Sequence, residues 1–312
     1  MVEPPHEPPA SIRVMTYNVH GLPALLRKRD TGSLQEIGQR FRHLRMHGRH
    51  PHIVVLQEAF TDEAKAIGRM GGYAYVVDGP SAQDPVGASP GNAANHWWAG
   101  EGLGKHVGSG LQVLSDFPVV ATVGKAFPEA ACAGFDCLAN KGILSVSVRI
   151  PGQSEPLDIV TTHFNSRRAS GVSHTRSNAA FERQTTALVE FLHRTRDPRR
   201  PRILAGDFNI GRDAVRQRLF RKAISDLTEH DRFDDALQFL HRHERRPLPE
   251  CVREAKERGK DLELWSNGSS WRLKPVRADA PFGHEPDGTM LSDHVGYQTE
   301  FRIIPGAIGR VQ

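Results

Sequence analysis

Acidic, amide and imidazole side chains recur at the edges of short apolar runs, where a β-strand would begin or end. Each has a residue type that can bind a metal ion or move a proton. The set consists of Asn18, Glu58, His163, Asp207, Asn209, Asp293 and His294. A single Asp after a strand is usually a turn residue. In a layered α/β fold, however, strand ends meet at one rim, where sites form, so we expect one site facing solvent at this rim.

Three of these side chains are suited to bind a divalent metal ion. A hard cation such as Mg²⁺, or Mn²⁺ in its place, prefers oxygen ligands and keeps several water molecules. Asn18, Glu58 and Asp293 are the predicted oxygen ligands. A metal ion held there would polarise a phosphoryl oxygen and neutralise the charge that develops on it.

The other four side chains are suited to activate water and to stabilise a transition state. A nucleophilic water needs a base, and Asp207 and His294 are the two candidates. Asn209 would orient the nucleophile. His163 would donate a hydrogen bond to the phosphoryl oxygens. The pattern therefore predicts metal-assisted hydrolysis of a phosphoester.

The surrounding pattern predicts strands that alternate with helices. Apolar spacing at Leu34, Ile37, Phe41 and Leu44 predicts a helix over 34–47, because offsets of three and four define one helical face. Thr61 is typical of a helix N-cap. A second helix is expected over 175–195 and a third from 211 onward. Strands are expected over 12–19, 53–57, 110–115, 118–123, 143–150, 157–163, 202–208 and 297–303, with a long surface loop over 80–103.

The chain has 312 residues, of which 38% are hydrophobic and 25% charged, and this composition indicates a single folded domain. We expect a disordered or extended segment over 1–11, a single domain over 12–304 and a tail over 305–312. The very polar segment near 241–262 is predicted to be an exposed insertion, partly helical. No apolar run reaches the roughly 18–20 residues of a membrane-spanning helix. The expected state is a monomer.

Charge and cysteine content leave alternatives open. The net charge of +5 fits a phosphate-bearing partner, and an arginine excess that reflects a GC-rich genome explains it equally well. Cys132 and Cys137 are either a short disulfide loop or two free thiols. The first ten residues contain no apolar segment of signal-peptide type, so the default expectation is a cytoplasmic protein, or a secreted or periplasmic one if the start is a processed one.

Five motifs occur in the order found in the endonuclease/exonuclease/phosphatase superfamily, and the chain resembles that superfamily from about residue 12 to 303. The motifs are Thr16-Tyr17-Asn18-Val19, Leu56-Gln57-Glu58, Thr162-His163-Phe164-Asn165-Ser166, Gly206-Asp207-Phe208-Asn209 and Ser292-Asp293-His294. The resemblance implies an α/β (α+β) fold, a four-layer sandwich of two packed mixed β-sheets flanked by helices.

The resemblance also implies a role for each residue of the site. Glu58 is expected to be the principal metal ligand, with Asn18 and Asp293 beside it. Asp207 is expected to activate or position the nucleophile, with Asn209 as its partner. The two histidines that flank the phosphate would be His163 and His294.

The chain departs from the superfamily at the carboxylate that orients a catalytic histidine. Many members have an Asp in a segment near Arg-Leu-Asp-Tyr-Ile, whereas this chain has Lys274 after Arg272-Leu273. Asp261 and Asp279 are the two substitutes, and the sequence does not choose between them.

The expected substrate is a phosphodiester of the phospholipid or small-molecule type. The segments 110–118 and 131–144 are similar to stretches of the neutral and bacterial sphingomyelinase branch. Trp97-Trp98 would suit a membrane interface as a peripheral contact, although anchoring of their own loop is the slightly favoured role. A nuclease ranks second because of the basic charge, and an inositol-type phosphomonoesterase third. A non-catalytic binding relative is disfavoured because the set of site residues is intact.

Overall fold

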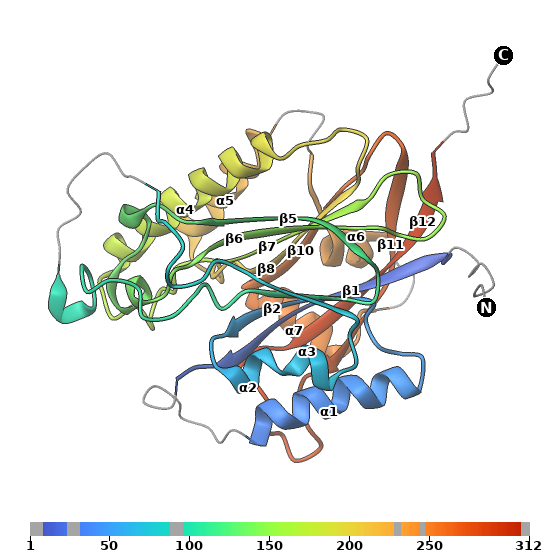
Figure 1. Cartoon of the computed structure of the whole chain (residues 1–312), viewed down its shortest axis with the longest axis horizontal. Coiled ribbons are helices and arrows are strands. Elements are labelled where there is room, and N and C mark those ends of the chain that lie inside the picture. Colours follow the sequence, from blue (N-terminus) through green and yellow to red (C-terminus); the bar gives the residue numbers. More distant parts are fainter. Residues whose placement is uncertain (1–8, 24–31, 88–95, 228–231, 244–246, 307–312) are drawn as a thin grey trace.

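Two mixed β-sheets of six strands each lie face to face and form the centre of the protein in a computed structural model (Figure 1). The structure describes residues 9–23, 32–87, 96–227, 232–243 and 247–306. The predicted N-terminal segment 1–11 and tail 305–312 lie mostly outside these residues, as do residues 88–95 of the expected long loop.

The first sheet has the strand order β11-β12-β1-β2-β4-β3. Strands β1 and β2 are parallel, and the other neighbours are antiparallel. The bounds are β1 Ser11–Gly21, β2 Ile53–Ala59, β3 Tyr75–Asp78, β4 Gln112–Ser115, β11 Trp271–Phe282 and β12 Gly296–Pro305.

The second sheet has the order β5-β6-β7-β8-β10-β9, and its parallel pair is β7 with β8. Each sheet therefore contains one parallel pair among antiparallel neighbours. The bounds are β5 Val119–Ala126, β6 Gly142–Val148, β7 Leu157–His163, β8 Arg202–Asp207, β9 Asp234–Asp235 and β10 Asp261–Ser266.

Helices cover the outer faces of both sheets and complete the predicted four-layer sandwich, which is thereby confirmed. In Figure 1, α1 (Gly32–Met46), α2 (Asp62–Lys65) and α3 (Ile67–Met70) lie below the first sheet. Above the second sheet lie α4 (His174–Arg194) and α5 (Ala214–Ser225). The Thr61 side chain accepts a hydrogen bond from the Ala64 amide and caps α2 as expected.

Apolar side chains fill the three spaces between the four layers. Between the sheets pack Ile12, Val14, Val55, Val146, Ile159 and Ile203, all fully buried. Separate clusters join the first sheet to α1–α3 and the second sheet to α4 and α5. Within the described residues, no helix combines the length and apolar character that crossing a bilayer requires.

The polar segment 241–262, expected to be an exposed and partly helical insertion, is helical over much of its length and packs one apolar face against the fold. It contains the end of α6 (Ala236–His243), all of α7 (Glu250–Arg258) and the start of β10. Val252 and Ala255, three residues apart on α7, are buried in a cluster with Leu240 and Tyr297. Because only one face of this helix is buried, its many charged residues on the other face hide the apolar pattern.

Candidate active site

The two parallel strand pairs explain how distant residues reach one edge of the sandwich. Parallel strands end at the same edge, so Asn18 on β1 lies near Glu58 on β2, and His163 on β7 pairs in register with Asp207 on β8. Strand β10 runs antiparallel to β8, so it begins where β8 ends, with Asp261 opposite Asp207. In the same way, β12 runs antiparallel to β1, and His294 lies just before it.

One carboxylate oxygen, Asp207 Oδ2, is the point where the predicted site residues converge. Asn18 Nδ2 lies 3.1 Å from it and Asn209 Nδ2 lies 3.5 Å from it. The Nε2 atoms of His163 and His294 lie 3.6 and 3.7 Å away. The other oxygen, Oδ1, accepts a hydrogen bond of 2.9 Å from the Asn209 amide. Three side chains from three other segments, and Asn209 from the same segment, thus surround a single carboxylate.

Burial changes the protonation of Asp207. The residue is 1% exposed, and this burial raises its pKa to about 6, although the nearby His294 opposes the shift. Gly206, directly before it, allows the close approach of β7, because a Cβ there would lie 2.2 Å from the Thr162 carbonyl oxygen. A carboxylate with a raised pKa is better suited to accept a proton near neutral pH.

Of the two candidates for the histidine-orienting carboxylate, Asp261 contacts His294 and Asp279 does not. Asp261 Oδ2 lies 2.8 Å from His294 Nδ1, whereas Asp279 accepts a hydrogen bond from Gln298 at 2.7 Å. Burial would lower the pKa of His294, but the carboxylates of Asp261 and Asp207 outweigh it and raise the pKa to about 10. His294 is therefore an imidazolium beside Asp207 at neutral pH.

His163 has the opposite protonation. Burial first, and then the charge of Lys141, lower its pKa to about 3, so the ring is neutral. Lys141 Nζ lies 3.4 Å from His163 Nε2 and donates to the Phe164 carbonyl at 3.0 Å. Asp136 completes this link through an ion pair of 3.1 Å with Lys141. Two histidines on either side of one carboxylate thus differ in charge.

Glu58 and Asp293 lie on either side of His20. The Nδ1 atom of His20 lies 3.5 Å from Glu58 Oε2 and 3.3 Å from Asp293 Oδ1. These carboxylates, Asp293 first, raise the pKa of His20 to about 9. The pKa of Glu58 is lowered to about 2, because contacts with His20, His163 and Asn18 outweigh its burial. Asn18 Nδ2 donates to Glu58 Oε1 at 3.0 Å, so the amide nitrogen bridges Glu58 and Asp207.

Backbone strain is concentrated at this site. In the described part of the chain, the non-glycine residues with positive φ are His20 (53°), Glu58 (56°) and Asn209 (50°). Such conformations are sparsely populated and persist where the surrounding structure enforces them, as at functional sites. All three residues carry side chains that point into the cluster around Asp207 or Glu58.

The donor set fits a divalent cation. Glu58 Oε2 is buried and accepts no hydrogen bond, which is the state expected of a ligand oxygen. A second group, Asp207, Asp261 and His294, has ligand atoms within 4.8 Å of one another, and among the described residues it is the one such group of His, Cys, Asp and Glu. Glu58 Oε2 and Asp261 Oδ1 both lack a hydrogen-bond partner, but Asp261 also binds His294 through Oδ2, so Glu58 is the better suited of the two to hold a metal ion.

The expectation of a rim of solvent-facing side chains needs correction. Asp207, His163 and His294 are all at least nine-tenths buried, and Asn18 is fully buried, whereas the Asp293 side chain is 54% exposed. Burial strengthens each charge interaction at the site.

Sequence reasoning missed three further residues at the site. His20 is one residue beyond the first motif, Lys141 lies in the Asn-Lys-Gly segment, and Arg216 lies on α5. The fully buried Arg216 guanidinium donates to the carbonyls of Asn165 and Asn209 at 2.8 and 2.7 Å, and so joins the loops after β7 and β8. His20 and Lys141 could have been predicted from their position beside the quoted motifs, whereas no sequence pattern indicates Arg216.

The sequence matches the model of the Endonuclease/Exonuclease/phosphatase family over residues 15–294. This span contains every residue of the cluster described above. The chain belongs to the Endonuclease/Exonuclease/phosphatase family. No curated protein matches the sequence.

Solved structures of low sequence identity share the fold of this family member. Sphingomyelinase C from Streptomyces griseocarneus is 20% identical with a TM-score of 0.55, covering 93% of this chain and 99% of that one. A beta toxin from Staphylococcus aureus with bound magnesium ions is 13% identical with a TM-score of 0.60, covering 93% and 99%. The human Nocturnin catalytic domain with bound sulfate is 15% identical with a TM-score of 0.59, covering 94% and 95%. At identities this low, the structural similarity establishes a shared fold and nothing more.

Proposed function

We propose that this family member is a metal-dependent phosphodiesterase that hydrolyses its substrate with an activated water. The convergence of Asn18, His163, Asn209 and His294 on Asp207 Oδ2 carries this proposal. A buried carboxylate with a pKa of about 6 is suited to accept a proton from water. The backbone N–H of Asn209 donates a hydrogen bond to the same carboxylate and so positions Asp207.

The two histidines would contact the phosphoryl group. His294, kept charged by Asp261, donates a hydrogen bond to an oxygen on which negative charge develops. Neutral His163 carries one N–H for the same purpose. Asn18 fixes the distance between Glu58 and Asp207 by donating to both.

Glu58 would hold a divalent ion, Mg²⁺ or Mn²⁺, with Asp293 as a further ligand. The third predicted ligand, Asn18, already makes hydrogen bonds through both its Nδ2 and its Oδ1. When bound, such an ion polarises a phosphoryl oxygen and offsets developing charge. The oxygens of Glu58 support this assignment because one of them is buried without a hydrogen-bond partner. Arg258 donates to the Asp293 carbonyl at 2.7 Å and so restrains the loop that carries this ligand.

The preferred substrate is a phosphodiester of the phospholipid type, and an exposed aromatic surface supports this choice. Trp97 and Trp98 on the short 3₁₀ helix η2 (Trp97–Ala99) are 66% and 64% exposed, and Phe135 on η4 (Gly134–Leu138) is 51% exposed. We call these three residues the aromatic patch. Tryptophan favours the boundary between water and membrane, and exposed apolar clusters mark binding surfaces.

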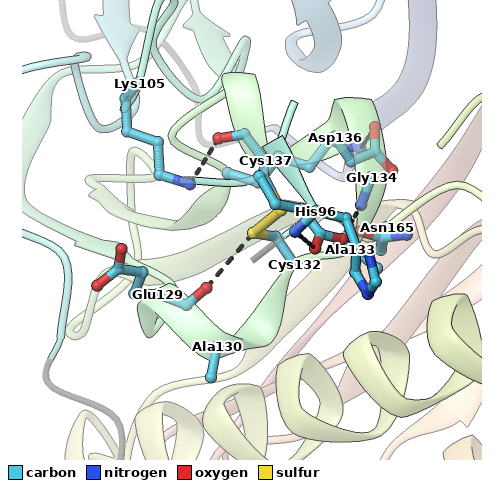
Figure 2. Close-up of a disulfide and its surroundings, with 12 residues drawn as sticks. His96, Lys105, Glu129, Ala130, Cys132, Ala133, Gly134, Asp136, Cys137 and Asn165 are labelled. Atoms are coloured by element: carbon cyan, nitrogen blue, oxygen red, sulfur yellow. Dashed lines mark hydrogen bonds and ion pairs between the residues drawn. A yellow bond between two sulfur atoms is a disulfide. The ribbon is translucent and has the colours of Figure 1, made fainter. Parts of the chain in front are cut away.

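The aromatic patch is built into the fold. Gly100 packs against Phe135, since a Cβ at Gly100 would lie 3.3 Å from the Phe135 Cα. Buried Glu101 accepts hydrogen bonds from the Gly134 and His96 amides at 2.7 and 3.1 Å, and it pairs with Arg176. Figure 2 shows the Cys132–Cys137 disulfide beside this junction, with Lys105 donating to the Cys137 carbonyl at 2.8 Å.

A short chain of contacts connects the aromatic patch to the site. Phe135 is followed by Asp136, which accepts a hydrogen bond from the Ser166 amide and pairs with Lys141. Lys141 in turn contacts His163. In Figure 1, η2 lies on the left, the side to which the arrowheads of β1 and β2 point. A lipid surface bound by the patch would therefore lie close to Asp207.

The test is a side-by-side hydrolysis assay with Mg²⁺ on sphingomyelin vesicles, plasmid DNA and an inositol phosphate, with Glu58→Gln as the blank. We expect cleavage of sphingomyelin that depends on Glu58, is abolished by a chelator and is restored by Mg²⁺ or Mn²⁺. Full activity in excess chelator, or equal activity of the Glu58→Gln variant, would overturn the metal-dependent mechanism.

Nuclease activity is the second candidate, favoured by the net charge of +5. Nicking of DNA without cleavage of sphingomyelin would select it. DNA cleavage would also weaken steeply with salt, because phosphate contacts by Arg and Lys release counterions. Hydrolysis of the inositol phosphate alone would instead select a phosphomonoesterase.

A further inference from the structure

We infer that a cavity at one edge of the second sheet is a separate ligand site, which takes an amphiphile with an apolar chain and an anionic head group, such as a fatty acid. The cavity has a volume of about 1040 Å³ and lies between α5, α6 and β10. The described residues that line it include neither Asp207 nor Glu58. This site therefore lies outside the proposed reaction centre, and the inference goes beyond the proposed function.

The short last strand of the second sheet leaves room for the cavity. Strand β9 is two residues long and pairs with β10 at Leu264 and Trp265 only. The chain then enters α6, so within the described residues the start of β10 has no strand neighbour on this side. Leu262 and Leu264 of β10 line the gap, together with side chains of α5 and α6.

Buried apolar side chains form much of the cavity wall. The most buried of them, none more than 7% exposed, are Phe220, Leu227, Phe233, Leu237 and Leu264. Pockets that bind small molecules are typically lined by apolar side chains with a few polar groups, at volumes up to about 1000 Å³. The wall therefore fits the hydrocarbon part of a ligand, which gains free energy when it leaves water.

Basic side chains line the more exposed part of the same cavity. They are Arg221, Arg232, Arg242 and Lys256, with His241 beside them. Arg232 pairs with Asp234 at 3.5 Å. No ion pair in the described part of the chain involves Arg221, Arg242 or Lys256. These three cations are free to bind an anionic head group, since charge-assisted hydrogen bonds are the strong ones.

The acidic side chains of the cavity do not cancel this charge. Asp235 and Asp261 line it, so two carboxylates stand against four Arg and Lys side chains. Asp235 accepts a hydrogen bond of 2.8 Å from the Gln238 amide, and Asp261 holds His294 at 2.8 Å. The cavity thus favours an anion and disfavours a cation of the same shape.

The cavity meets the reaction centre only from behind. Asp261 and Tyr297 line it, and the Tyr297 hydroxyl donates to the Asp261 carbonyl at 3.3 Å. Asp261 turns its Oδ2 atom to His294, which faces Asp207. A ligand in the cavity would lie behind this carboxylate, so its binding should require neither the metal ion nor the substrate.

The first experiment is isothermal titration calorimetry with three soluble probes in excess chelator. We expect decanoate to bind at one site. Butyrate has the same head group with a shorter chain, and we expect it to bind more than about 100-fold more weakly, because each buried CH₂ adds to affinity. Decyltrimethylammonium has the same chain with the opposite charge, and we expect a loss of at least about tenfold.

Variants of α5 locate the bound probe, with a matched control on the same helix for each. Ile224→Trp fills the cavity and Arg221→Glu reverses a charge in its lining, and each should weaken decanoate binding by at least about tenfold. Val215→Trp and Arg218→Glu change exposed residues of α5 outside the lining, and should leave the affinity unchanged. Thermal melting checks that all four variants are folded, and Arg221→Glu keeps the test valid if Ile224→Trp is not.

Several outcomes would overturn the inference. They are equal affinity for decanoate and decyltrimethylammonium, equal losses in the cavity variants and their controls, and loss of decanoate binding in Trp97→Ala, which would place the probe on the aromatic patch. A dimer that Ile224→Trp abolishes would assign the cavity to a second copy of the chain. Glu58→Gln should bind decanoate like the wild type, so failure of the proposed hydrolysis would leave this inference intact.

Discussion

The site around Asp207 and the aromatic patch invert the usual relation between polarity and burial. Polar groups of the site, such as Asp207 and His163, are almost fully buried, whereas Trp97 and Trp98 of the patch are about two-thirds exposed. Buried polar groups and exposed apolar clusters are the informative exceptions in a folded protein. Because both exceptions occur in neighbouring segments, we interpret the first as chemistry and the second as contact with a surface.

The two regions also differ in how they are held. Each polar group of the site is restrained by side chains from several strands, because a buried charge without a partner would destabilise the fold. The aromatic patch is held by local interactions, namely the hydrogen bonds of Glu101 and the Cys132–Cys137 disulfide. Substitutions in the site should therefore lower turnover, and substitutions in the aromatic patch should weaken binding to the lipid surface.

The largest expected effect is that of Asp207→Asn. Turnover should fall on the order of 10²–10⁴-fold, the contribution of a general base, because an amide has the same shape but cannot take the proton. The melting temperature should change by less than about 2 °C, a shift that corresponds to roughly 1 kcal/mol in a protein of this size. Asp226→Asn, at the end of α5, is the control for an aspartate away from the site. A large loss of stability together with activity would mean that Asp207 serves the fold and not the reaction.

Asp261→Asn should reduce turnover less, by about 10- to 100-fold, the usual effect of losing the partner that orients a functional histidine. The pKa of His294, about 10 with Asp261 in place, should fall, which NMR titration of the imidazole would detect. Asp279→Asn should alter neither quantity, because Asp279 binds Gln298. A fall in turnover with no change in the His294 pKa would contradict the orienting role.

Activity should decline as the pH falls below about 6, because burial raises the pKa of Asp207 to about that value. The sign follows from the role of a base, which is inactive once protonated, so kcat/KM should drop about tenfold per pH unit below the pKa. His163, with a pKa of about 3, should not contribute to this limb. A profile that stays flat down to pH 4.5 would remove Asp207 as the base.

The smallest expected effect is that of the aromatic patch. Trp97→Ala and Trp98→Ala should each lower hydrolysis of lipid vesicles about fivefold, a loss of roughly 1 kcal/mol of binding, and leave hydrolysis of a water-soluble phosphodiester unchanged. Val123→Ala on β5 is the control, since Val123 is also an exposed apolar side chain. Equal losses on both substrates would mean that the tryptophans anchor their loop, and the comparison between the two regions would fail.

The sequence alone determined the alternation of strands and helices and the seven predicted site residues through local patterns, and its resemblance to a superfamily implied the four-layer sandwich. Apolar runs of five to eight residues form buried strands, and a polar residue at the end of such a run, Glu58 or Asp207 for example, must lie at the edge of a sheet. The four-layer sandwich that the motifs implied is confirmed, and the seven residues lie together. Their roles stay predictions.

Only the tertiary structure decided which partners those residues have. The choice of Asp261 over Asp279 depends on β10 pairing antiparallel to β8, a contact between segments more than 50 residues apart in the chain. Other long-range contacts bury one face of the polar segment 241–262, and the pairing of β12 with β1 places Asp293 beside His20. The bond between Cys132 and Cys137 was likewise open in the sequence. Local patterns fix which side chains lie at an edge, and strand register across the chain fixes which of them meet.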